Sequence, residues 1–338
     1  MNTNIPKTQK AVVLTENGAK PVITEIPVPQ PGSGEVLIKM YASPINPSDL
    51  SFIAGGYGLK KLYPVVPGFE GSGTVVAAGK GILPKLWMGK NVACAASPKY
   101  NGCWAEHMLT TATSCVPLSK EISMEQGAMM FVNPMTALAF FEIYKKLPNP
   151  GKKLRGIINT AAASALGKMV IKMGKTQGIP VISVVRREEQ VEILKAEGAE
   201  FIVNSSDVDF EKKLKELAHK INATVIFDCV GGKMIQQLID AAPNESKLFV
   251  YGRLSSELCE IQPGNLIFTG SQIQGFWLTN RLKTQSLLQT ILNVRKAHSL
   301  IGNELATKIH KTFQPEQITE AIETYQNNMS KGKVLIRF

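Results

Sequence analysis

The stretch from Gly156 to Arg187 reads GIINTAAASALGKMVIKMGKTQGIPVISVVRR and decides the fold. The apolar pair Ile157-Ile158 predicts a short strand, and the small residues of 159–167 predict a turn. Apolar residues spaced three or four apart then predict a helix that ends at Gly178, before a second strand at 181–185. Strand, turn, helix and strand form a βαβ unit. Such a turn can receive the pyrophosphate of a dinucleotide at the helix N-terminus.

The turn departs from the G-x-G-x-x-G pattern of dinucleotide sites. Its three glycine positions are occupied by Ala162, Ser164 and Gly167. Small residues still suit the close approach of a ligand to the backbone and the close packing of the helix on the strand. Taken alone, the turn leaves a dinucleotide site and an ordinary α/β loop equally open.

Two arginines at the end of the second strand favour the dinucleotide site. NAD enzymes carry an acidic residue about twenty positions past the turn, where it binds the ribose hydroxyl. Here Arg186 and Arg187 stand in that region. A guanidinium can clamp the 2′-phosphate of NADP, which a carboxylate would repel. The pattern therefore predicts NADPH as the cofactor, with two solvated arginines at a helix start as the alternative.

The composition indicates a two-domain protein in a reducing compartment. The chain has 338 residues and a net charge of +11, which favours anionic partners such as nucleotides, coenzyme A or an acidic carrier protein. It shows no nucleic-acid module and no apolar run of about eighteen residues, so we expect neither nucleic-acid binding nor a membrane span. Its five cysteines are scattered, which argues against a disulfide framework.

The chain changes character near residue 123. Before that point, short strands and many glycines predict a β-rich, partly open barrel. After it, helices alternate with apolar strands, which predicts a doubly wound parallel sheet of the Rossmann type. The tail holds a strand at 309–313, a helix from Pro315 and a last strand at 334–338, and we expect it to return to the first domain. The predicted domains are 1–134 with 300–338, and 135–299.

Several short motifs resemble one known family. The chain resembles the medium-chain dehydrogenase/reductase superfamily, in its zinc-free branch of quinone oxidoreductases and mitochondrial trans-2-enoyl thioester reductases. The resemblance implies a GroES-like barrel as the catalytic domain beside a Rossmann domain. The matching pieces are Pro44-Ile45-Asn46-Pro47-Ser48-Asp49, Gly56-Tyr57-Gly58, Val132-Asn133-Pro134 with Thr136-Ala137, Asp228 to Lys233, and Gly275-Phe276-Trp277-Leu278.

The same comparison bears on metal binding. Zinc enzymes of the superfamily carry Cys where Asn46 stands, His where Phe69 stands and a further Cys near Asn133. Asparagine and phenylalanine are not ligands of a tetrahedral zinc site, which takes Cys, His or carboxylate side chains. We therefore expect no metal.

The resemblance also implies the site residues. Tyr57 would be the catalytic proton donor, with a loop tyrosine that merely covers a pocket as the alternative. Asn46 and Trp277 would line the substrate pocket. The cofactor contacts would be Asn133, Ala163, Ser164, Ala165, Leu166, Gly167, Arg186, Arg187, Tyr251, Gly252, Phe276, Trp277, Leu278 and Lys333.

Some of these contacts have other interpretations. Phe276 and Trp277 could be core aromatics, and Lys333 could be an exposed terminal lysine. Two departures from the family pattern also bear on the cofactor. Ala165 stands where glycine is usual and could crowd the pyrophosphate, and Arg253 follows Tyr251-Gly252 where glycine is usual and could fill part of the pocket.

Three functions follow as hypotheses. The first is NADPH-dependent reduction of 2-enoyl thioesters carried by coenzyme A or acyl carrier protein. The second is reduction of quinones or enones by the same hydride, and the third is a non-catalytic structural subunit that keeps the fold. We expect a homodimer, located in the mitochondrial matrix by resemblance, or in the cytoplasm because no transit peptide is evident.

Overall fold

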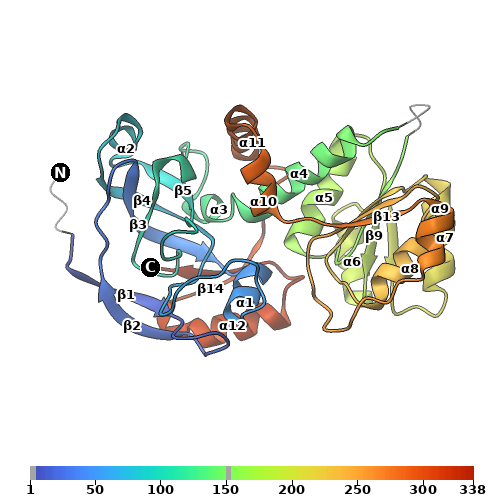
Figure 1. Ribbon diagram of the computed structural model, residues 1–338, viewed down its shortest axis with the longest axis horizontal. Coiled ribbons are helices and arrows are strands. Elements are labelled where there is room, and N and C mark those ends of the chain that lie inside the picture. The colour runs from blue at the N-terminus through green and yellow to red at the C-terminus, as the bar shows by residue number, and fades with distance from the viewer. Residues whose placement is uncertain (1–4, 150–153) are drawn as a thin grey trace. The chain divides into compact units, whose positions relative to one another are not determined.

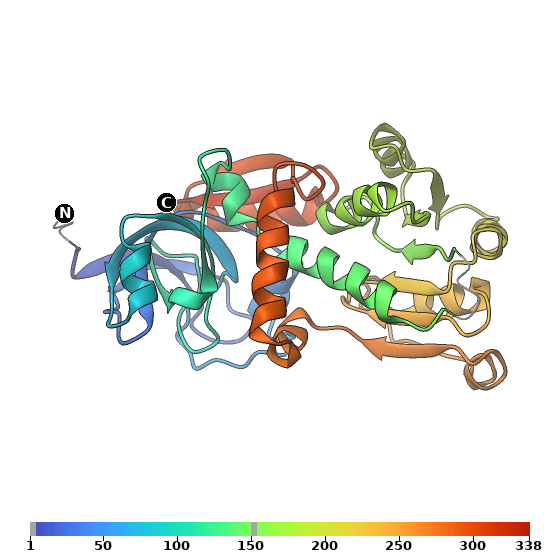
Figure 2. The same ribbon diagram turned by 90° about the horizontal axis from the view of Figure 1, so that it is seen from above.

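The computed structural model describes residues 5–149 and 154–338, apart from the side chain of Leu287. The chain divides into two compact units. Unit 1 comprises Met1–Met135 with Ile291–Phe338, and unit 2 comprises Thr136–Thr290. Figures 1 and 2 show the tail of the chain, in red, beside the blue strands of unit 1. The division at residues 134 and 299 stays a prediction for the domain boundaries.

Unit 1 is built on a seven-stranded sheet of mostly antiparallel strands. In spatial order the strands are β14 (Ile309–Phe313), β15 (Lys333–Arg337), β3 (Glu35–Pro44), β4 (Glu70–Ala78), β5 (Asn91–Ala95) and β7 (Cys115–Pro117), with β6 (His107–Thr111) paired to β3. A separate hairpin joins β1 (Thr8–Val13) to β2 (Val22–Pro27). The β-rich first part predicted from the sequence is confirmed.

The last strand ties the two ends of unit 1 together. β15 runs antiparallel to β3, with Leu335 opposite Pro44. Helix α12 (Ile318–Asn327) places Ile318, Ala321 and Tyr325 in the same buried cluster as two residues of β15. The predicted return of the tail is therefore confirmed. The other helical segments of this unit are α1 (Pro47–Ile53), α2 (Ile82–Trp87), η1 (Ala112–Ser114), α3 (Met124–Ala128) and η3 (Pro315–Gln317).

Unit 2 contains a six-stranded sheet in which every pairing is parallel. Its spatial order is β10 (Phe201–Asn204), β9 (Val181–Val185), β8 (Ile157–Asn159), β11 (Val225–Asp228), β12 (Lys247–Val250) and β13 (Gln272–Gly275). This is the strand order of a doubly wound dinucleotide-binding fold, as predicted. Its helices are α5 (Ala165–Thr176), α6 (Glu188–Ala196), α7 (Phe210–Lys220), α8 (Lys233–Ala241), α9 (Pro263–Thr269) and α10 (Leu278–Thr284).

Along the strands of unit 2, successive side chains point to opposite faces of the sheet, and hydrophobic side chains pack on both faces. Ile226 joins a cluster with Leu214 of α7 and Leu238 of α8. Its neighbour Phe227 stacks on Phe140, with ring centroids 4.0 Å apart. Because successive residues of a strand point to opposite faces, one strand serves two hydrophobic cores. Phe140 belongs to α4 (Val132–Lys146), which contributes residues to both units, as does α11 (Leu287–Leu300).

The βαβ unit predicted at 156–187 forms as β8, α5 and β9. A Cβ atom on Gly167 would lie 2.4 Å from the carbonyl oxygen of Ala162, so the helix can pack this close to the turn only with glycine there. Ala161, by contrast, has φ of 46°. That backbone region is costly for a residue with a side chain.

We predict that Ala161→Gly stabilises unit 2. Relief of the left-handed backbone should raise the free energy of unfolding by about 1 kcal/mol, net of the extra entropy of glycine in the unfolded chain. Urea denaturation followed by circular dichroism measures the change. Ala163→Gly, in the same turn without a positive φ, is the matched control and should destabilise. If Ala161→Gly were less stable than the parent, the claim that Ala161 strains the backbone would be wrong.

Candidate functional site

A network of buried polar groups lies at the centre of unit 1. It joins Asn46, Asp49, Glu70 and Lys333, each at most 2% exposed. Asn46 and Asp49 flank the start of α1, Glu70 opens β4, and Lys333 opens β15. Buried charged groups are stable only when they are paired and hydrogen-bonded. Three distant parts of the sequence therefore depend on each other here.

Glu70 connects Asn46 to the start of α4. One carboxylate oxygen accepts a hydrogen bond from the Asn46 side-chain amide at 3.0 Å. The other accepts from the backbone N–H groups of Phe131 and Val132, at 2.8 and 2.9 Å. The first N–H groups of a helix lack partners within it, and a carboxylate there is favourable. Glu70 thus fixes the turn that carries Asn133, which is 9% exposed.

Lys333 and Asp49 complete the network. The Lys333 ammonium donates to the side-chain oxygen of Asn46 and, at 3.3 Å, to the carbonyl of Ile45. Asp49 accepts from the backbone N–H of Asn46 at 2.8 Å and from that of Phe69 at 3.1 Å. Both ends of the Asn46 amide are therefore bonded. Lys333 is buried rather than an exposed terminal lysine, and its role toward the cofactor stays a prediction.

Burial shifts the titration of all three charged groups. Desolvation raises the pKa of Asp49 to about 7, partly offset by the N–H of Asn46 and the charge of Lys333. Desolvation also raises the pKa of Glu70, opposed by Lys333 and by the hydrogen bonds that it accepts. The pKa of Lys333 falls to about 8 for the same reason, opposed by the two carboxylates. The network can therefore gain or lose a proton near neutral pH.

Tyr57 lies next to this network through Phe69. The two ring centroids are 4.9 Å apart, and the centroid of the Phe52 ring lies 5.7 Å from that of Phe69. Tyr57 follows two exposed glycines and is itself half-buried. Phe69 donates its backbone N–H to Asp49. The structure thus brings the predicted catalytic tyrosine close to the segment that holds Asn46.

In unit 2 the predicted pyrophosphate turn precedes α5. The Ser164 hydroxyl accepts from the N–H of Gly167 at 3.1 Å and caps the helix. Within the described residues, no hydrogen bond is formed by the N–H groups of Ala163, Ala165 and Leu166. Free N–H groups at a helix start, with the positive end of its dipole, suit an anionic phosphate. The turn fits the pyrophosphate of a dinucleotide.

The two arginines lie at the carboxyl end of β9. Both are exposed, and the side chain of Gln190 accepts from their backbone N–H groups at 3.0 and 3.2 Å. The hydroxyl of Ser206 donates to the carbonyl of Arg186 at 2.7 Å. The loop between β9 and α6 is thereby held in place, and the two arginines on it are exposed. An exposed guanidinium on a fixed loop suits a phosphate monoester.

The next turns along the sheet are also fixed by side chains. Asp228 accepts from the hydroxyl of Thr160 at 2.6 Å and from the N–H of Gly231 at 2.8 Å. A Cβ atom on Gly252 would lie 2.7 Å from that of Cys229, so glycine is required there for packing. The backbone N–H of Tyr251 donates to the backbone carbonyl of Asp228 at 2.8 Å. Tyr251 and Gly252 therefore adjoin the carboxyl ends of the strands.

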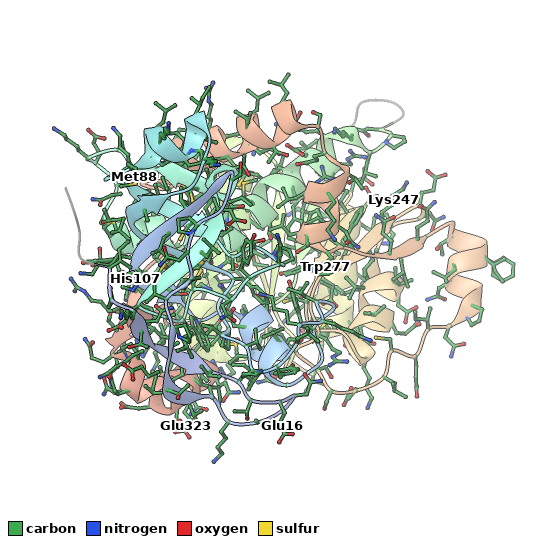
Figure 3. The ribbon with its side chains drawn as sticks, turned by 60° about the vertical axis from the view of Figure 1, so that its left-hand side comes forward. Glu16, Met88, His107, Lys247, Trp277 and Glu323 are labelled. Atoms are coloured by element: carbon green, nitrogen blue, oxygen red, sulfur yellow. The ribbon has the colours of Figure 1, made fainter. Side chains whose placement is uncertain are left out.

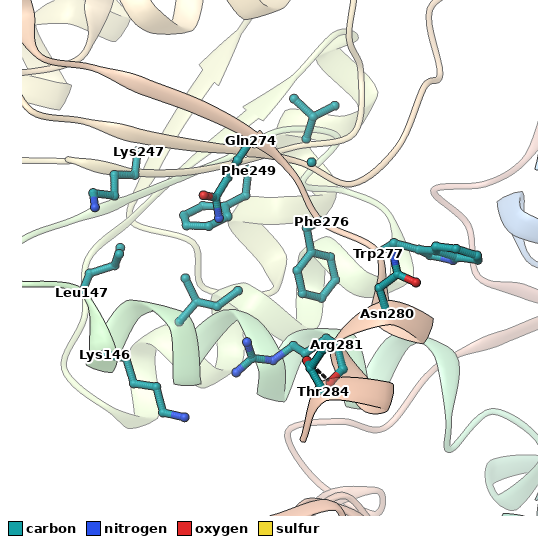
Figure 4. A pocket seen from close by; sticks show the side chains of 13 residues that line it. Lys146, Leu147, Lys247, Phe249, Gln274, Phe276, Trp277, Asn280, Arg281 and Thr284 are labelled. Atoms are coloured by element: carbon teal, nitrogen blue, oxygen red, sulfur yellow. Dashed lines mark hydrogen bonds between the residues drawn. The ribbon is translucent and has the colours of Figure 1, made fainter. Parts of the chain in front are cut away.

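The remaining predicted contacts follow β13. The ring of Phe276 contacts that of Phe140 at 5.1 Å between centroids, so it is partly a core aromatic. Trp277 is half-buried and precedes α10, which starts at Leu278. Phe276 and Trp277 both line a cavity of unit 2 (Figure 4). Of the two predicted substrate-pocket residues, Asn46 belongs to unit 1 and Trp277, which Figure 3 labels, belongs to unit 2.

The donor set does not fit a metal ion. Asn46 and Phe69 supply no zinc ligand, and the amide of Asn46 is bonded to Lys333 and Glu70. In the part of the chain that the structure describes, no group of three His, Cys, Asp or Glu side chains could hold a metal.

In residues 5–149 and 154–338, no helix has the length and apolarity to cross a membrane.

Family comparison agrees with this architecture. Residues 32–120 match the alcohol dehydrogenase GroES-like domain, and residues 165–293 match the family described as zinc-binding dehydrogenase. The chain belongs to the medium-chain dehydrogenase/reductase superfamily, in the branch of quinone oxidoreductases and enoyl thioester reductases. It is thus a member of a family of NADPH-dependent oxidoreductases.

Three relatives illustrate this membership. The mitochondrial enoyl-[acyl-carrier-protein] reductase of Arabidopsis thaliana is 30% identical over 283 residues, which cover 81% of this chain and 73% of the relative. A putative NADPH:quinone reductase from Mesorhizobium loti is 32% identical, with a TM-score of 0.91 over 99% of this chain and 100% of that one. The Etr1p complex with NADP and crotonyl-CoA is 25% identical, with a TM-score of 0.82 over 98% and 100%.

Sequence reasoning missed the roles of Asp49 and Glu70. Asp49 ends the motif at 44–49 and Glu70 follows Phe69, but neither was assigned to the site. Their burial could have been suspected, because each is an isolated acid in a stretch of apolar and small residues, and such acids are seldom buried without a partner. The partner, Lys333, lies more than 260 residues further along the chain. Only the pairing of β15 with β3 brings it near.

We predict a pH-dependent loss of stability from Asp49. Its pKa of about 7 exceeds the ordinary aspartate value of 3.8, so the folded state holds the proton more tightly than the unfolded state. This stabilisation is complete below about pH 4 and is lost as the pH rises through 7. The shift corresponds to roughly 4 kcal/mol, and Asp49→Asn should remove most of that loss.

Urea unfolding at pH 4 to 8 gives the free energy of unfolding as a function of pH. The effect is the difference between parent and variant in the slope of that free energy against pH. Glu323→Gln, an exposed acid in the same unit, is the control and should keep the parent slope. If the free energy of unfolding of Asp49→Asn had the same slope against pH as that of the parent, Asp49 would be ionised over the whole range from pH 4 to 8.

Proposed function

We propose that this protein is an NADPH-dependent reductase of α,β-unsaturated thioesters. When bound, NADPH supplies a hydride to the β-carbon of the enoyl group. The electron pair of the double bond then moves toward the thioester carbonyl, and a proton must reach the α-carbon. Together the hydride and the proton give the saturated thioester and NADP⁺. The protein must orient the two reactants and supply the proton.

The observation that carries this proposal is the position of Tyr57. Its ring is packed on Phe69, and the backbone of Phe69 is bonded to Asp49 of the buried network. A phenol is protonated at neutral pH and can donate a proton to a developing enolate. The similarity to a structure that holds NADP and crotonyl-CoA supports an enoyl thioester as the substrate.

The charged groups of unit 2 support NADPH as the hydride source. The start of α5 would hold the pyrophosphate, and Arg186 would hold the 2′-phosphate. Ala165 stays partly exposed at that turn, where its methyl group would lie beside the pyrophosphate.

Arg186→Ala should therefore weaken NADPH binding about ten- to hundredfold and leave NADH binding nearly unchanged. A charge-assisted hydrogen bond to phosphate is typically worth about 1.5–3 kcal/mol. Fluorescence titration with both cofactors measures the ratio. Lys195→Gln removes a cation near the far end of α6 and serves as the control. Equal losses for both cofactors would refute the phosphate contact.

Tyr57→Phe should lower the turnover of crotonyl-CoA by at least about tenfold, because general-acid assistance is typically worth 10²–10⁴-fold. The NADPH affinity should hold, since only a hydroxyl is lost. Stopped-flow measurement of NADPH oxidation gives both values. A variant as fast as the parent would show that Tyr57 is not the donor.

Quinone reduction is the second candidate, supported by the likeness to the putative NADPH:quinone reductase. A quinone accepts electrons without needing a proton placed on carbon. Its reduction should therefore be much less sensitive to Tyr57→Phe, and an ortho-quinone assay separates the two activities. If NADPH did not bind at all, the non-catalytic structural subunit would be the better account.

The finer assignments rest on the relatives. We propose coenzyme A or acyl carrier protein as the acyl carrier and a role in fatty acid metabolism in the mitochondrial matrix, following the name of the Arabidopsis thaliana relative. A cytoplasmic location and a homodimeric state remain further proposals.

A further inference from the structure

A cavity of unit 1 is lined by none of the residues assigned to the cofactor, the substrate or the proton donor. Its volume is about 280 Å³, just below the range of drug-sized ligand sites, so it suits a smaller ligand. Apolar side chains line it from two segments: Ile26, Pro27 and Pro29, at or next to β2, and Ala105 and Leu109, at or next to β6. Burial of an apolar ligand surface against these side chains is favourable.

His107 lines this cavity and has an imidazole ring without a partner. Figure 3 labels this residue, which is 8% exposed. Its Nδ1 atom is buried and forms no hydrogen bond with any described residue. Burial lowers the pKa of His107, opposed by Glu106 and reinforced by Lys39, so the ring is neutral at pH 7. A buried polar ring without a partner often marks the place of a bound water or ligand.

Two amide side chains that line the cavity have their oxygen atoms engaged. The Gln9 oxygen accepts from the backbone N–H of His107, and the Asn101 oxygen accepts from that of Val66 at 3.0 Å. Because a backbone N–H can only donate, these bonds fix which end of each amide is the oxygen. The NH₂ groups of Gln9 and Asn101 form no hydrogen bond among the described residues. Both amides therefore offer N–H donors to a ligand.

The charge of the lining also favours an anion. Lys99 lines the cavity, is exposed, and holds its ammonium 5.1 Å from the centre of the Tyr100 ring. No Asp or Glu is among the described residues of the lining. Glu35, which binds the Tyr100 hydroxyl, also accepts from the N–H of Gly32 at 2.8 Å. An anion would thus meet donors and a cation, whereas a cationic ligand would find no carboxylate in the lining.

We infer that this cavity binds a small aromatic monocarboxylate, with its carboxylate at Gln9 and His107 and its ring against the apolar lining. The hydrogen bond between Gln9 and the backbone of His107 holds these two residues together. The Gln9 amide and the neutral imidazole can each donate one N–H to the carboxylate. The inference does not depend on the proposed reduction, since the cavity includes neither Tyr57 nor any residue of unit 2.

Size and polarity together select this class of ligand. A neutral arene would cover the apolar side chains but leave the buried donors unpaired. Inorganic phosphate would pair with the donors but leave the apolar lining in contact with water. A single ring with one carboxylate satisfies both, because its apolar part is buried and its charge is hydrogen-bonded.

The histidine side chains provide a direct reporter of occupancy. The chain has four histidines, at positions 107, 219, 298 and 310, so ¹⁵N labelling of histidine gives a spectrum in which each imidazole can be followed by NMR. Benzoate, titrated into the full-length protein without NADPH and at constant ionic strength, should shift the His107 signals saturably. The other three rings should be unaffected, and His107→Gln assigns the signal. Benzamide, which has the same shape without the charge, should bind at least about tenfold more weakly.

Conservative variants test the donors. Gln9→Glu keeps an oxygen for the backbone N–H of His107 but loses the NH₂ group, and it should weaken benzoate binding by about tenfold or more. Asn101→Asp makes the same change at an exposed position, where the carboxylate is ionised, and should also weaken binding. Gln30→Glu is the matched control, because it is exposed and lies outside the lining, and it should bind like the parent.

Four results would overturn the inference. The first is the absence of a saturable shift at His107, and the second is equal affinity for benzoate and benzamide. The third is parent affinity in both Gln9→Glu and Asn101→Asp. The fourth is displacement of benzoate by crotonyl-CoA, which would mean that the cavity belongs to the substrate site. Reduction of crotonyl-CoA is measured separately, so a failure here is distinguishable from a failure of the proposed enzyme.

Discussion

The burial of Lys333 against Glu70 and Asp49 is the constraint on which unit 1 depends. A lysine and two carboxylates are removed from water, and each is stable there only because the others and the Asn46 amide are present. The ammonium can reach Asn46 only if the tail returns and β15 pairs with β3. One set of contacts therefore ties the end of the chain to α1, to β4 and to the start of α4.

In unit 2, backbone N–H groups on fixed turns provide a candidate binding site. Its parallel strands end in turns that side chains hold, as Asp228 does through Thr160 and Gly231. The N–H groups of Ala163, Ala165 and Leu166, at the start of α5, remain without partners among the described residues. Fixed turns with free donors form an anion site that needs no reorganisation on binding. The exposed Arg186 adds the charge that would distinguish NADPH from NADH.

Much of the fold could be predicted because its signals are local. The run from Gly156 to Arg187 predicted β8, α5 and β9, since periodicity and small residues act within about thirty positions. The network around Lys333 could not be predicted, because its partners meet only through long-range strand pairing. Phe276 was predicted as a cofactor contact, but the cavity that it lines together with Phe249 was not predicted.

The central claim is that the fold delivers a hydride from NADPH to an enoyl thioester. Turnover of crotonyl-CoA with NADPH deuterated at C4, followed by NMR of the product, tests it most directly. The account predicts one deuterium at the β-carbon of butanoyl-CoA and a proton from solvent at the α-carbon. Deuterium at the α-carbon would contradict it, as would a protein that oxidises NADPH with an ortho-quinone but leaves crotonyl-CoA unchanged.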